Sequence, residues 1–392
     1  MSRVGIFGGS FNPPHCGHIQ AIEQFQEKLQ LDCVLVVPAA MPPHKQLPLC
    51  SPDAAARLAL TKLATAHLPY VQVCDLELCR EGKSYTAETV AQIRAQRPND
   101  TLFLLVGTDM LLSFSSWYQP QEIVKHAALA VAQRDFSQRE EMEKCAQMLR
   151  NTLSAQVLLI ENAVLACSST SVRAMLAFGC GKDYLPEAVY EAITREGLYF
   201  SKRSLKNLPF AELSQVSLSL HMPKRVKHVI GCSETARELA LQYGADEHDA
   251  MRAGILHDVT KALGAAEQLK LCKQYAILLD KFEEENPKLL HAKSGAAVAS
   301  QVFGESAAVR DAIFWHTTGK ADMTLLEKIL YIADYIEPNR SFAGVERLRL
   351  LAKSDLDAAV MLGIEMSVAQ LTARNCEIDP NSLAALEFLK KG

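Results

Sequence analysis

The chain has 392 residues, of which 49% are hydrophobic and 22% charged, and its formal net charge is −4. This length favours two or more globular domains, and the charge argues against nucleic acid as a partner. No apolar run approaches the roughly 18–20 residues of a membrane span, and there is no signal-peptide layout, so we expect a cytoplasmic protein without membrane contacts. The 11 cysteines include no C-x-x-C pair, which disfavours disulfide and zinc sites.

Residues 1–200 alternate short apolar runs with helical patterns. The runs, which we predict to be strands, are Val4–Phe7, Cys33–Val37, Val71–Val73, Leu102–Val106, Leu129–Ala132 and Val157–Ile160. The helical patterns between them lie at about 19–29, 52–66, 86–96 and 138–152. This alternation predicts an α/β fold with a doubly wound, Rossmann-like parallel sheet. Ligands of such sheets bind outside the carboxyl ends of the strands.

The segment SKRSLKNLPFAEL, residues 201–213, interrupts this pattern because it is basic and contains Pro209. We predict a linker over 204–215, between one domain at 1–203 and another at 216–392. Beyond about 214 the strand pattern stops. Helical patterns follow at about 225–243, 246–259, 264–277, 290–303, 307–316, 324–336 and 354–373. The second domain is therefore predicted to be all-α.

The segment VGIFGGSFNPPHCGH, residues 4–18, reads as a strand, a glycine-rich loop and a helix start. Small residues let backbone N–H groups approach an anion, and the start of a helix favours negative charge. His15 and His18 stand at that helix start, where they could donate to phosphate oxygens or simply cap the helix. The preceding GGSFNPP favours the first interpretation, a phosphate cradle.

Four further segments of unusual composition follow strand ends: PAAMPPHK (38–45), REGKSYT (80–86), GTDMLLSFSSW (107–117) and CSSTSVR (167–173). With the H-x-G-H loop they resemble the bacterial nicotinate-nucleotide adenylyltransferases, which belong to the nucleotidyltransferase superfamily, over about 200 residues. The resemblance implies adenylyl transfer from ATP to nicotinate mononucleotide, giving deamido-NAD and pyrophosphate, with Mg²⁺ as cofactor. A different adenylyl- or cytidylyltransferase is the alternative.

The resemblance also implies roles for individual residues. His18 and His15 would be catalytic. The ATP-binding set would be Gly8, Gly9, Ser10, Phe11, His15, His18, Ser168, Ser169, Thr170 and Arg173. The mononucleotide-binding set would be Lys45, Tyr85, Thr86, Asp109 and Trp117, with Trp117 stacked on the pyridine ring. The alternatives are that Trp117 is an ordinary core or surface aromatic, that Lys45 is a solvated lysine, and that Ser169 to Arg173 form a helix N-cap region.

The second half carries a different set of histidines and carboxylates. They are His228, His257, Asp258, His291, His316 and Asp334. Imidazole and carboxylate groups together suit iron, manganese, zinc or nickel. The apolar residues before His257 predict a buried helix for the His257–Asp258 pair, and Asp334 falls beside an apolar face, where a carboxylate needs a charged partner or a metal. Each of these six residues, taken alone, could instead be an ordinary buried polar residue whose hydrogen bonds are made within the core. His248, in a polar EHD context, is expected to face solvent.

The motifs AGILHDVTK (253–261), LLHAKSGA (289–296), HTTGK (316–320) and KILYIADYIEPNR (328–340) resemble the HD-domain metal-dependent phosphohydrolases over about 216–380. Among these, they are similar to the bacterial enzymes that split diadenosine tetraphosphate symmetrically into two ADP. The resemblance implies two transition-metal ions, iron being expected, held by those six residues, with Asp258 catalytic and bridging.

The resemblance also leaves choices open in this half. Lys261 would bind a phosphate unless it is a solvated lysine, and Arg340 is a weaker phosphate candidate. Another nucleotide phosphohydrolase and a non-catalytic nucleotide sensor are the alternatives. The sequence leaves open whether the chain forms a homo-oligomer.

Overall fold

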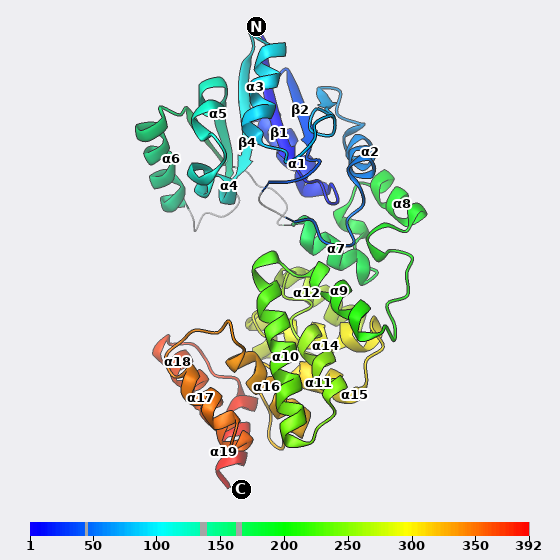
Figure 1. Cartoon of the computed structure of the whole chain (residues 1–392), viewed down its shortest axis with the longest axis vertical. Helices are drawn as coiled ribbons and strands as arrows, with labels where there is room; N and C mark the ends of the chain where they lie inside the picture. Colours follow the sequence, from blue (N-terminus) through cyan, green and yellow to red (C-terminus); the bar gives the residue numbers. More distant parts are fainter. Residues whose placement is uncertain (44–45, 134–138, 162–166, 392) are drawn as a thin grey trace. The chain divides into compact units, whose positions relative to one another are not determined.

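The computed structural model describes residues 1–43, 46–133, 139–161 and 167–391. The chain divides into two compact units, Met1–Lys202 and Arg203–Gly392. Figure 1 follows the sequence from blue to red through both units. The first is built on a sheet and the second on helices alone among the residues that the structure describes. The predicted combination of an α/β fold followed by a helical domain is confirmed.

A six-stranded parallel sheet forms the centre of the first unit, as far as it is described. Its strands are β1 (Arg3–Gly9), β2 (Cys33–Pro38), β3 (Val71–Val73), β4 (Thr101–Gly107), β5 (Ala128–Gln133) and β6 (Val157–Glu161). The strand order is β3-β2-β1-β4-β5-β6. The order reverses between β1 and β4, which pair in parallel. In doubly wound sheets the crevice outside the strand ends at this reversal is where ligands bind.

Helices cover both faces of the sheet (Figure 1). One face carries α1 (Cys16–Leu29), α2 (Ala54–Thr65), α7 (Ser169–Ala177) and α8 (Glu187–Glu196). The other carries α3 (Thr86–Gln96), α4 (Thr108–Leu112), α5 (Pro120–His126) and α6 (Arg139–Leu153). Successive side chains of a strand point to opposite faces, so Val34 and Val36 join one buried cluster while Leu35 and Val37 join the other. Burial on both faces explains why the strands read as continuous apolar runs.

The second unit is a helical assembly. Its helices are α9 (Phe210–Leu220), α10 (Val226–Tyr243), α11 (Glu247–Leu256), α12 (Ala265–Gln274), α13 (Lys281–Glu285), α14 (Leu290–Gln301), α15 (Ala307–Trp315), α16 (Leu325–Ile336), α17 (Val345–Ala352), α18 (Leu356–Ala373) and α19 (Pro380–Lys391). Helices α10 and α11 approach closely because α11 has a glycine at the contact. A Cβ on Gly254 would lie 2.5 Å from the Cα of Ser233.

Several elements differ from the sequence predictions. Helix α9 occupies the second half of the predicted linker 204–215, and it packs against α11. The His257–Asp258 pair does not lie on a helix, because α11 ends at Leu256 and the chain continues as a turn. The short helices α13 and α17 and the terminal helix α19 had no predicted counterpart.

Helix α18 differs from the expectation that no segment is apolar and long enough to cross a membrane. Its 18 residues meet that test by length and composition, and 28% of them are buried within the structure. The helix packs against α16, α17 and α19. Core helices of water-soluble domains pass the same test, so length and composition alone do not assign α18 to a membrane.

Candidate active sites in the two units

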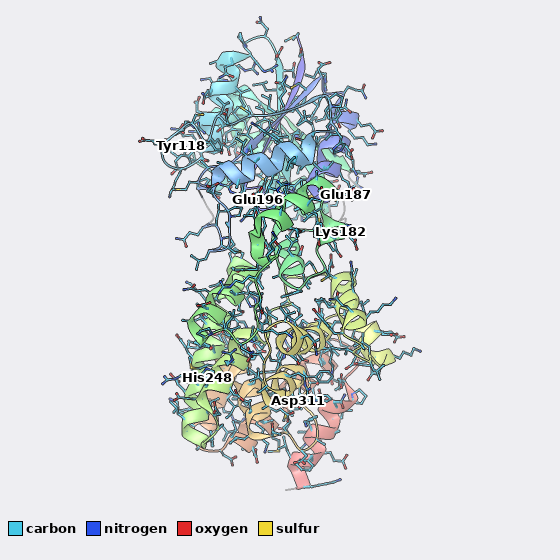
Figure 2. All side chains as sticks on the ribbon, turned by 90° about the vertical axis from the view of Figure 1, so that its right-hand side faces the viewer. Tyr118, Lys182, Glu187, Glu196, His248 and Asp311 are labelled. Carbon is cyan, nitrogen blue, oxygen red and sulfur yellow. The ribbon has the colours of Figure 1, made fainter. Side chains whose placement is uncertain are left out.

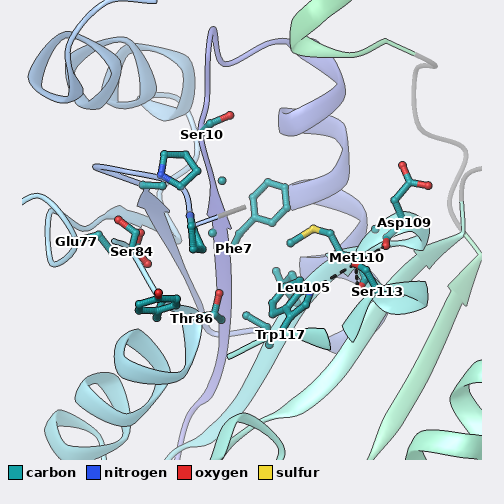
Figure 3. Close-up of a pocket in the computed structure, with 18 of the residues that line it drawn as sticks. Phe7, Ser10, Glu77, Ser84, Thr86, Leu105, Asp109, Met110, Ser113 and Trp117 are labelled. Carbon is teal, nitrogen blue, oxygen red and sulfur yellow. Dashed lines mark hydrogen bonds between the residues drawn. The ribbon is translucent and has the colours of Figure 1, made fainter. Parts of the chain in front are cut away.

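A pocket of about 790 Å³ opens at the carboxyl ends of the central strands of the first unit. Eight of the residues predicted for the nucleotide site line it: Gly8, Gly9, Ser10, His18, Tyr85, Thr86, Asp109 and Trp117. In Figure 3, Thr86 and Ser84 lie on one side of the pocket and Asp109 and Met110 on the other, with Phe7 between them. The two sides come from elements that flank the reversal between β1 and β4, which is the position that the fold predicts.

His18 faces this pocket from the first turn of α1. Its Nδ1 accepts a hydrogen bond from the backbone N–H of His15, at 3.1 Å. In a neutral imidazole the other nitrogen then carries the proton, so Nε2 is a donor. The ring of His15 lies 3.7 Å from that of His18, centre to centre, and is itself buried. A donor at the start of a helix, beside a glycine-rich strand end, suits a phosphate oxygen.

The predicted segment CSSTSVR packs against the loop that follows β1. Ser168 caps α7 by accepting from the N–H of Ser171. Ser169 donates to the carbonyl of Pro13 at 3.1 Å, and Arg173 donates to the carbonyl of Asn12 at 2.7 Å. Arg173 is almost fully buried and also donates to Thr170. In this structure, therefore, Arg173 holds the loop in place. Ser168, Ser169, Thr170 and Arg173, like Phe11 and His15, are not among the described residues lining the pocket.

On one side of the pocket, a second buried arginine joins the loop after β1 to the loop after β2. Arg57, on α2, donates to the carbonyl of Ser10 at 2.7 Å and to that of Ala39 at 2.6 Å. A third bond reaches the carbonyl of Ala40 at 3.0 Å. Ser10 follows β1 and Ala39 follows β2, so one guanidinium fixes the relative position of both loops. Lys45, predicted to contact the mononucleotide, lies outside the described residues.

A buried carboxylate lies in the pocket wall beside the SYT segment. Glu77 lines the pocket and accepts a hydrogen bond from the hydroxyl of Thr89 at 2.6 Å. Burial raises the pKa of Glu77. The hydroxyl of Ser84 accepts from the backbone N–H groups of Ala40 and Met41. Trp117 packs beside Phe114 with 5.3 Å between ring centres, and it borders both the pocket and the core.

In the second unit, four histidine rings are oriented by bonds to their Nδ1 atoms. For His257, His291 and His316 the acceptors are the carbonyls of Gly254 (2.7 Å), Lys288 (2.6 Å) and Ile313 (2.6 Å). For His228 the acceptor is the carboxylate of Glu337, at 3.1 Å. Because each Nδ1 faces an oxygen, it must carry the proton, which leaves every Nε2 unprotonated, with a lone pair that can accept.

These Nε2 atoms converge in two pairs. The Nε2 atoms of His228 and His257 lie 3.3 Å apart, and those of His291 and His316 lie 3.2 Å apart. Two lone pairs facing each other repel unless a cation lies between them. Burial favours the neutral form of three of these rings, because it lowers the pKa of His257 and of His291 well below the usual value and that of His316 to about 4. The arrangement therefore fits metal ions bound by neutral imidazole.

Asp258 lies between the two pairs. Its Oδ1 is 3.3 Å from the Nε2 of His291, and its Oδ2 is 3.4 Å from the Nε2 of His257. Asp334 adds a carboxylate oxygen 3.1 Å from the Nε2 of His228. These side chains form two overlapping donor groups, which are sets of residues whose ligand atoms could hold a metal ion. One set is His228, His257 and Asp334, and the other is His257, Asp258 and His316. All six predicted ligands thus come together, from α10, the turn after α11, α14, the end of α15 and α16. His248 is exposed, as predicted (Figure 2).

The comparisons with known proteins match the two units of the chain to different families. Residues 6–175 match the cytidylyltransferase-like family model. A protein of Exiguobacterium sibiricum named "probable nicotinate-nucleotide adenylyltransferase" is 35% identical over 198 residues, which are 98% of its length and 50% of this chain. A protein of the same name from Pseudomonas fluorescens is 35% identical over 213 residues, 97% of its length and 50% of this chain.

The first half of the chain belongs to the nicotinate-nucleotide adenylyltransferase family. Residues 225–339 of the second half match the HD domain model. Among solved structures, a "predicted HD superfamily hydrolase involved in NAD metabolism" from Clostridium acetobutylicum is 34% identical and covers 47% of this chain and 98% of that chain, with a TM-score of 0.46. The HD domain and its donor groups together indicate a divalent-metal site.

Some residues of both sites had no predicted role. In the adenylyltransferase-family half, Glu77 stands three residues before Arg80, the first residue of the segment that supplied the SYT motif. In the HD domain, Glu337 follows Asp334 by three residues inside a motif that was already noted, and Arg225 precedes His228 by three. For Arg225 and Glu337 the available signal was a charged side chain three residues from a predicted ligand, whereas Glu77 had none.

Proposed function

We propose that the first unit transfers the adenylyl group of ATP to nicotinate mononucleotide, giving deamido-NAD and pyrophosphate. The observation that supports this most directly is the joint lining of one pocket. The phosphate-cradle residues Gly8 to Ser10 and His18 share it with the SYT segment and Trp117. Its volume, about 790 Å³, is in the range of pockets that hold small-molecule ligands.

In the proposed reaction an oxygen of the mononucleotide phosphate bonds to the α-phosphorus of ATP, and the bond from that phosphorus to the pyrophosphate oxygen breaks. Negative charge grows on the leaving phosphates. The Nε2–H of His18 and the backbone N–H groups of the glycine loop are preorganised donors for that charge. Mg²⁺ bound with ATP would neutralise further charge on the phosphates. The backbone around Tyr85 and Thr86 would receive the pyridine carboxylate, and Asp109 would bind a ribose hydroxyl.

Product analysis with the full chain tests this proposal. ATP and CTP would each be offered with nicotinate mononucleotide, nicotinamide mononucleotide and phosphopantetheine, and the products separated by chromatography. We expect deamido-NAD from ATP and nicotinate mononucleotide. His18→Ala should lower turnover by about 10²–10³-fold, the effect of removing one preorganised donor, while mononucleotide binding changes little. A rate close to that of the wild type would remove His18 from the mechanism.

For the second unit we infer hydrolysis of a phosphoanhydride, with diadenosine tetraphosphate as substrate and two ADP as products. The supporting observation is the convergence of four unprotonated Nε2 atoms and two carboxylates in a buried cluster. Two divalent transition-metal ions, of which iron is our expectation, would supply Lewis-acid activation there. Water adds to a phosphorus in the middle of the chain, and the bridging P–O bond breaks.

The ligand residues have defined tasks in this proposal. Asp258, with one oxygen toward each histidine pair, would bridge the two ions. The Nδ1 bonds of the four histidines keep their Nε2 atoms aimed inward. Lys261 would hold a phosphate, and burial together with the charge of Arg225 lowers its pKa to about 8. A lysine in that range is largely charged at neutral pH.

Anaerobic purification followed by metal analysis tests the metal site. We expect about two ions per chain, and loss of both metal and dinucleotide hydrolysis in Asp258→Ala. Asp311→Ala, at an aspartate on α15 outside the donor groups (Figure 2), is the matched control. A metal-free protein that still cleaves the substrate would contradict the proposal. Tight nucleotide binding without turnover would instead favour a sensor, and cleavage of other nucleotides alone would favour another phosphohydrolase.

A further inference from the structure

Three cationic side chains contact the metal-ligand cluster of the second unit. The guanidinium of Arg225 donates to Oδ2 of Asp258. The ammonium of Lys261 lies 2.8 Å from the Nε2 of His291 and 3.9 Å from Oδ1 of Asp258. Arg340 donates to Oδ1 of Asp334 at 2.5 Å. Each cation thus pairs with an atom that the proposed metal ions would use.

These cations are also the most exposed members of the cluster. The side chains of Lys261 and Arg340 are each 36% exposed and that of Arg225 is 26% exposed, whereas Asp334 reaches 17% and Asp258 only 2%. A substrate approaching from solvent therefore meets the cations before it meets the ligand atoms. Positive charge on the open side of a buried site favours an anionic ligand.

The charges of the cluster balance without any bound ion. Three cationic side chains, Arg225, Lys261 and Arg340, oppose three carboxylates, those of Asp258, Asp334 and Glu337. Each divalent ion that binds adds two positive charges and takes over carboxylate oxygens that the cations now contact. The arginine and lysine side chains are then free to pair with a ligand. A ligand that pairs with them and offsets the excess positive charge must carry several negative charges, as a phosphate chain does.

Arg225 is the cation best placed to change partners. Its backbone is fixed as the N-cap residue immediately before α10, with its N–H bonded to the carbonyl of Met222 at 2.8 Å. Within the described residues its side chain bonds only Asp258, and its buried Nε finds no hydrogen-bond partner. Arg340, by contrast, also donates to the backbone carbonyl of Asp334 at 2.8 Å. A guanidinium with unused donors can bind phosphate oxygens in a bidentate manner.

We propose that Arg225 exchanges partners on metal binding, leaving Asp258 for the phosphate chain of the substrate. Arg225 and the metal compete for Oδ2 of Asp258, so the arginine opposes metal binding and supports substrate binding. The proposal rests on the phosphohydrolase function inferred above, but only on its metal and phosphate parts. It makes Arg225 a substrate-binding residue of this site rather than a structural ion pair.

Opposite changes in the affinity for metal and in the affinity for phosphate distinguish a substrate-binding role of Arg225 from a structural one. In the full chain, treated with chelator and then titrated with Mn²⁺, Arg225→Ala should bind the metal about three- to tenfold more tightly. The Mn²⁺-loaded variant should bind tripolyphosphate at least tenfold more weakly than the wild type, the loss expected when one charge-assisted bidentate contact is removed. Tripolyphosphate is the probe because its binding does not depend on which nucleotide is the natural substrate.

Two further variants complete the experiment. Lys224→Ala removes the neighbouring exposed cation from the same segment, and it should change neither affinity by more than about twofold. Arg225→Gln keeps most of the side-chain volume and serves if the alanine variant does not fold. Weaker metal binding in either Arg225 variant, or unchanged tripolyphosphate binding, would overturn the proposal. Failure of the chain to cleave diadenosine tetraphosphate would refute only the assigned substrate.

Discussion

His228 donates a hydrogen bond from Nδ1 to Oε1 of Glu337, at 3.1 Å, across 109 positions of the sequence. The carboxylate of Glu337 is almost fully buried and also accepts from the backbone and side chain of Asn339, at 2.7 and 2.8 Å. The bond fixes the ring so that Nε2 faces His257 and Asp334. Carboxylates that orient a ligand histidine in this way raise its basicity toward a metal.

Glu337→Gln should therefore weaken metal binding, although Glu337 is not itself expected to touch the metal. An amide can offer its oxygen to Nδ1 but has lost the charge, and such changes cost about 10–100-fold in metal affinity. Titration of the chelator-treated protein with Mn²⁺ measures the effect. Glu346→Gln, at an exposed side chain of the same unit, is the control. Unchanged affinity in Glu337→Gln would show that the bond to His228 does not support the site.

Gly254→Ala should destabilise the second unit severely. Its Cβ would lie 2.5 Å from the backbone Cα of Ser233, so α10 and α11 would have to separate. Overpacking of this kind costs about 1–3 kcal/mol or more. Gly363→Ala is the matched control because its Cβ would meet Tyr331 at 3.4 Å, an ordinary contact. Helix propensity predicts that this variant is neutral or more stable by up to about 1 kcal/mol. Thermal unfolding of both variants compares them.

Arg57→Met should affect the stability and the substrate affinity of the first unit together. The variant leaves the carbonyls of Ser10, Ala39 and Ala40 without their donor. Loss of a buried charged donor costs about 1.5–3 kcal/mol. Because both loops border the pocket, the KM values for ATP and for the mononucleotide should both rise. Arg195→Met, at an exposed side chain of the same unit, should change neither. A stable variant with normal KM values would contradict the loop-fixing role.

Trp117→Ala distinguishes a ring-stacking residue from an ordinary core aromatic. If Trp117 stacks on the pyridine ring, the KM for the mononucleotide should rise by about tenfold or more while that for ATP changes little. Trp117→Phe should retain most of the affinity, because it keeps an aromatic face. A loss of stability without a selective change in KM would instead support packing against Phe114 as its main role.

His221 should make the second unit sensitive to acid. The ring is buried beside Ser217, and burial, with the charge of Arg225, lowers its pKa from 6.5 to about 3. The unfolded chain takes up this proton near pH 6.5, whereas the folded one resists it down to about pH 3. Stability present above pH 6.5 is therefore lost progressively as the pH falls toward 3, by a few kcal/mol.

Comparison with a variant isolates the contribution of His221, because burial also lowers the pKa of His257, His291 and His316. In His221→Gln the unfolding free energy, measured by urea denaturation of chelator-treated protein between pH 4 and 7.5, should fall less steeply with acid than in the wild type. Parallel pH profiles would show that His221 does not contribute. The variant should also be less stable at pH 7.5 if the ring packs as the structure shows.

The sequence predicted the sheet well because each strand is buried on both faces and bounded by turn residues. All six apolar runs correspond to strands, and the most marked deviations in composition fall at the sheet end where the pocket opens. The helical half was harder. Helix α17 buries Val345, Leu348 and Ala352 at helical spacing, but its eight residues make only about two turns, too few to establish a period. The His257–Asp258 pair was expected on a helix because Gly254 to Leu256 are apolar, but α11 ends immediately before it.

Supporting residues escaped prediction for a physical reason. Arg57, Glu77, Arg225 and Glu337 act through bonds to groups distant in the chain, and the sequence does not show which groups these are. Arg57 lies within an ordinary amphipathic helix, and nothing in that helix marks its side chain as buried. Ligand types and spacings are visible in a sequence, whereas the partners that orient them become visible only when the chain is folded.

The position of β1 between β2 and β4 has a consequence for how the first unit is made. β1 is the earliest strand of its sheet to be synthesised, and it can pair with β2 as soon as residues 33–38 have emerged from the ribosome. Its other edge stays open until Thr101 and the rest of β4 follow. During that interval the backbone of the strand that carries the glycine loop is available to other extended chains. Chaperone binding and misassembly on the ribosome should therefore concentrate in the period before β4 appears.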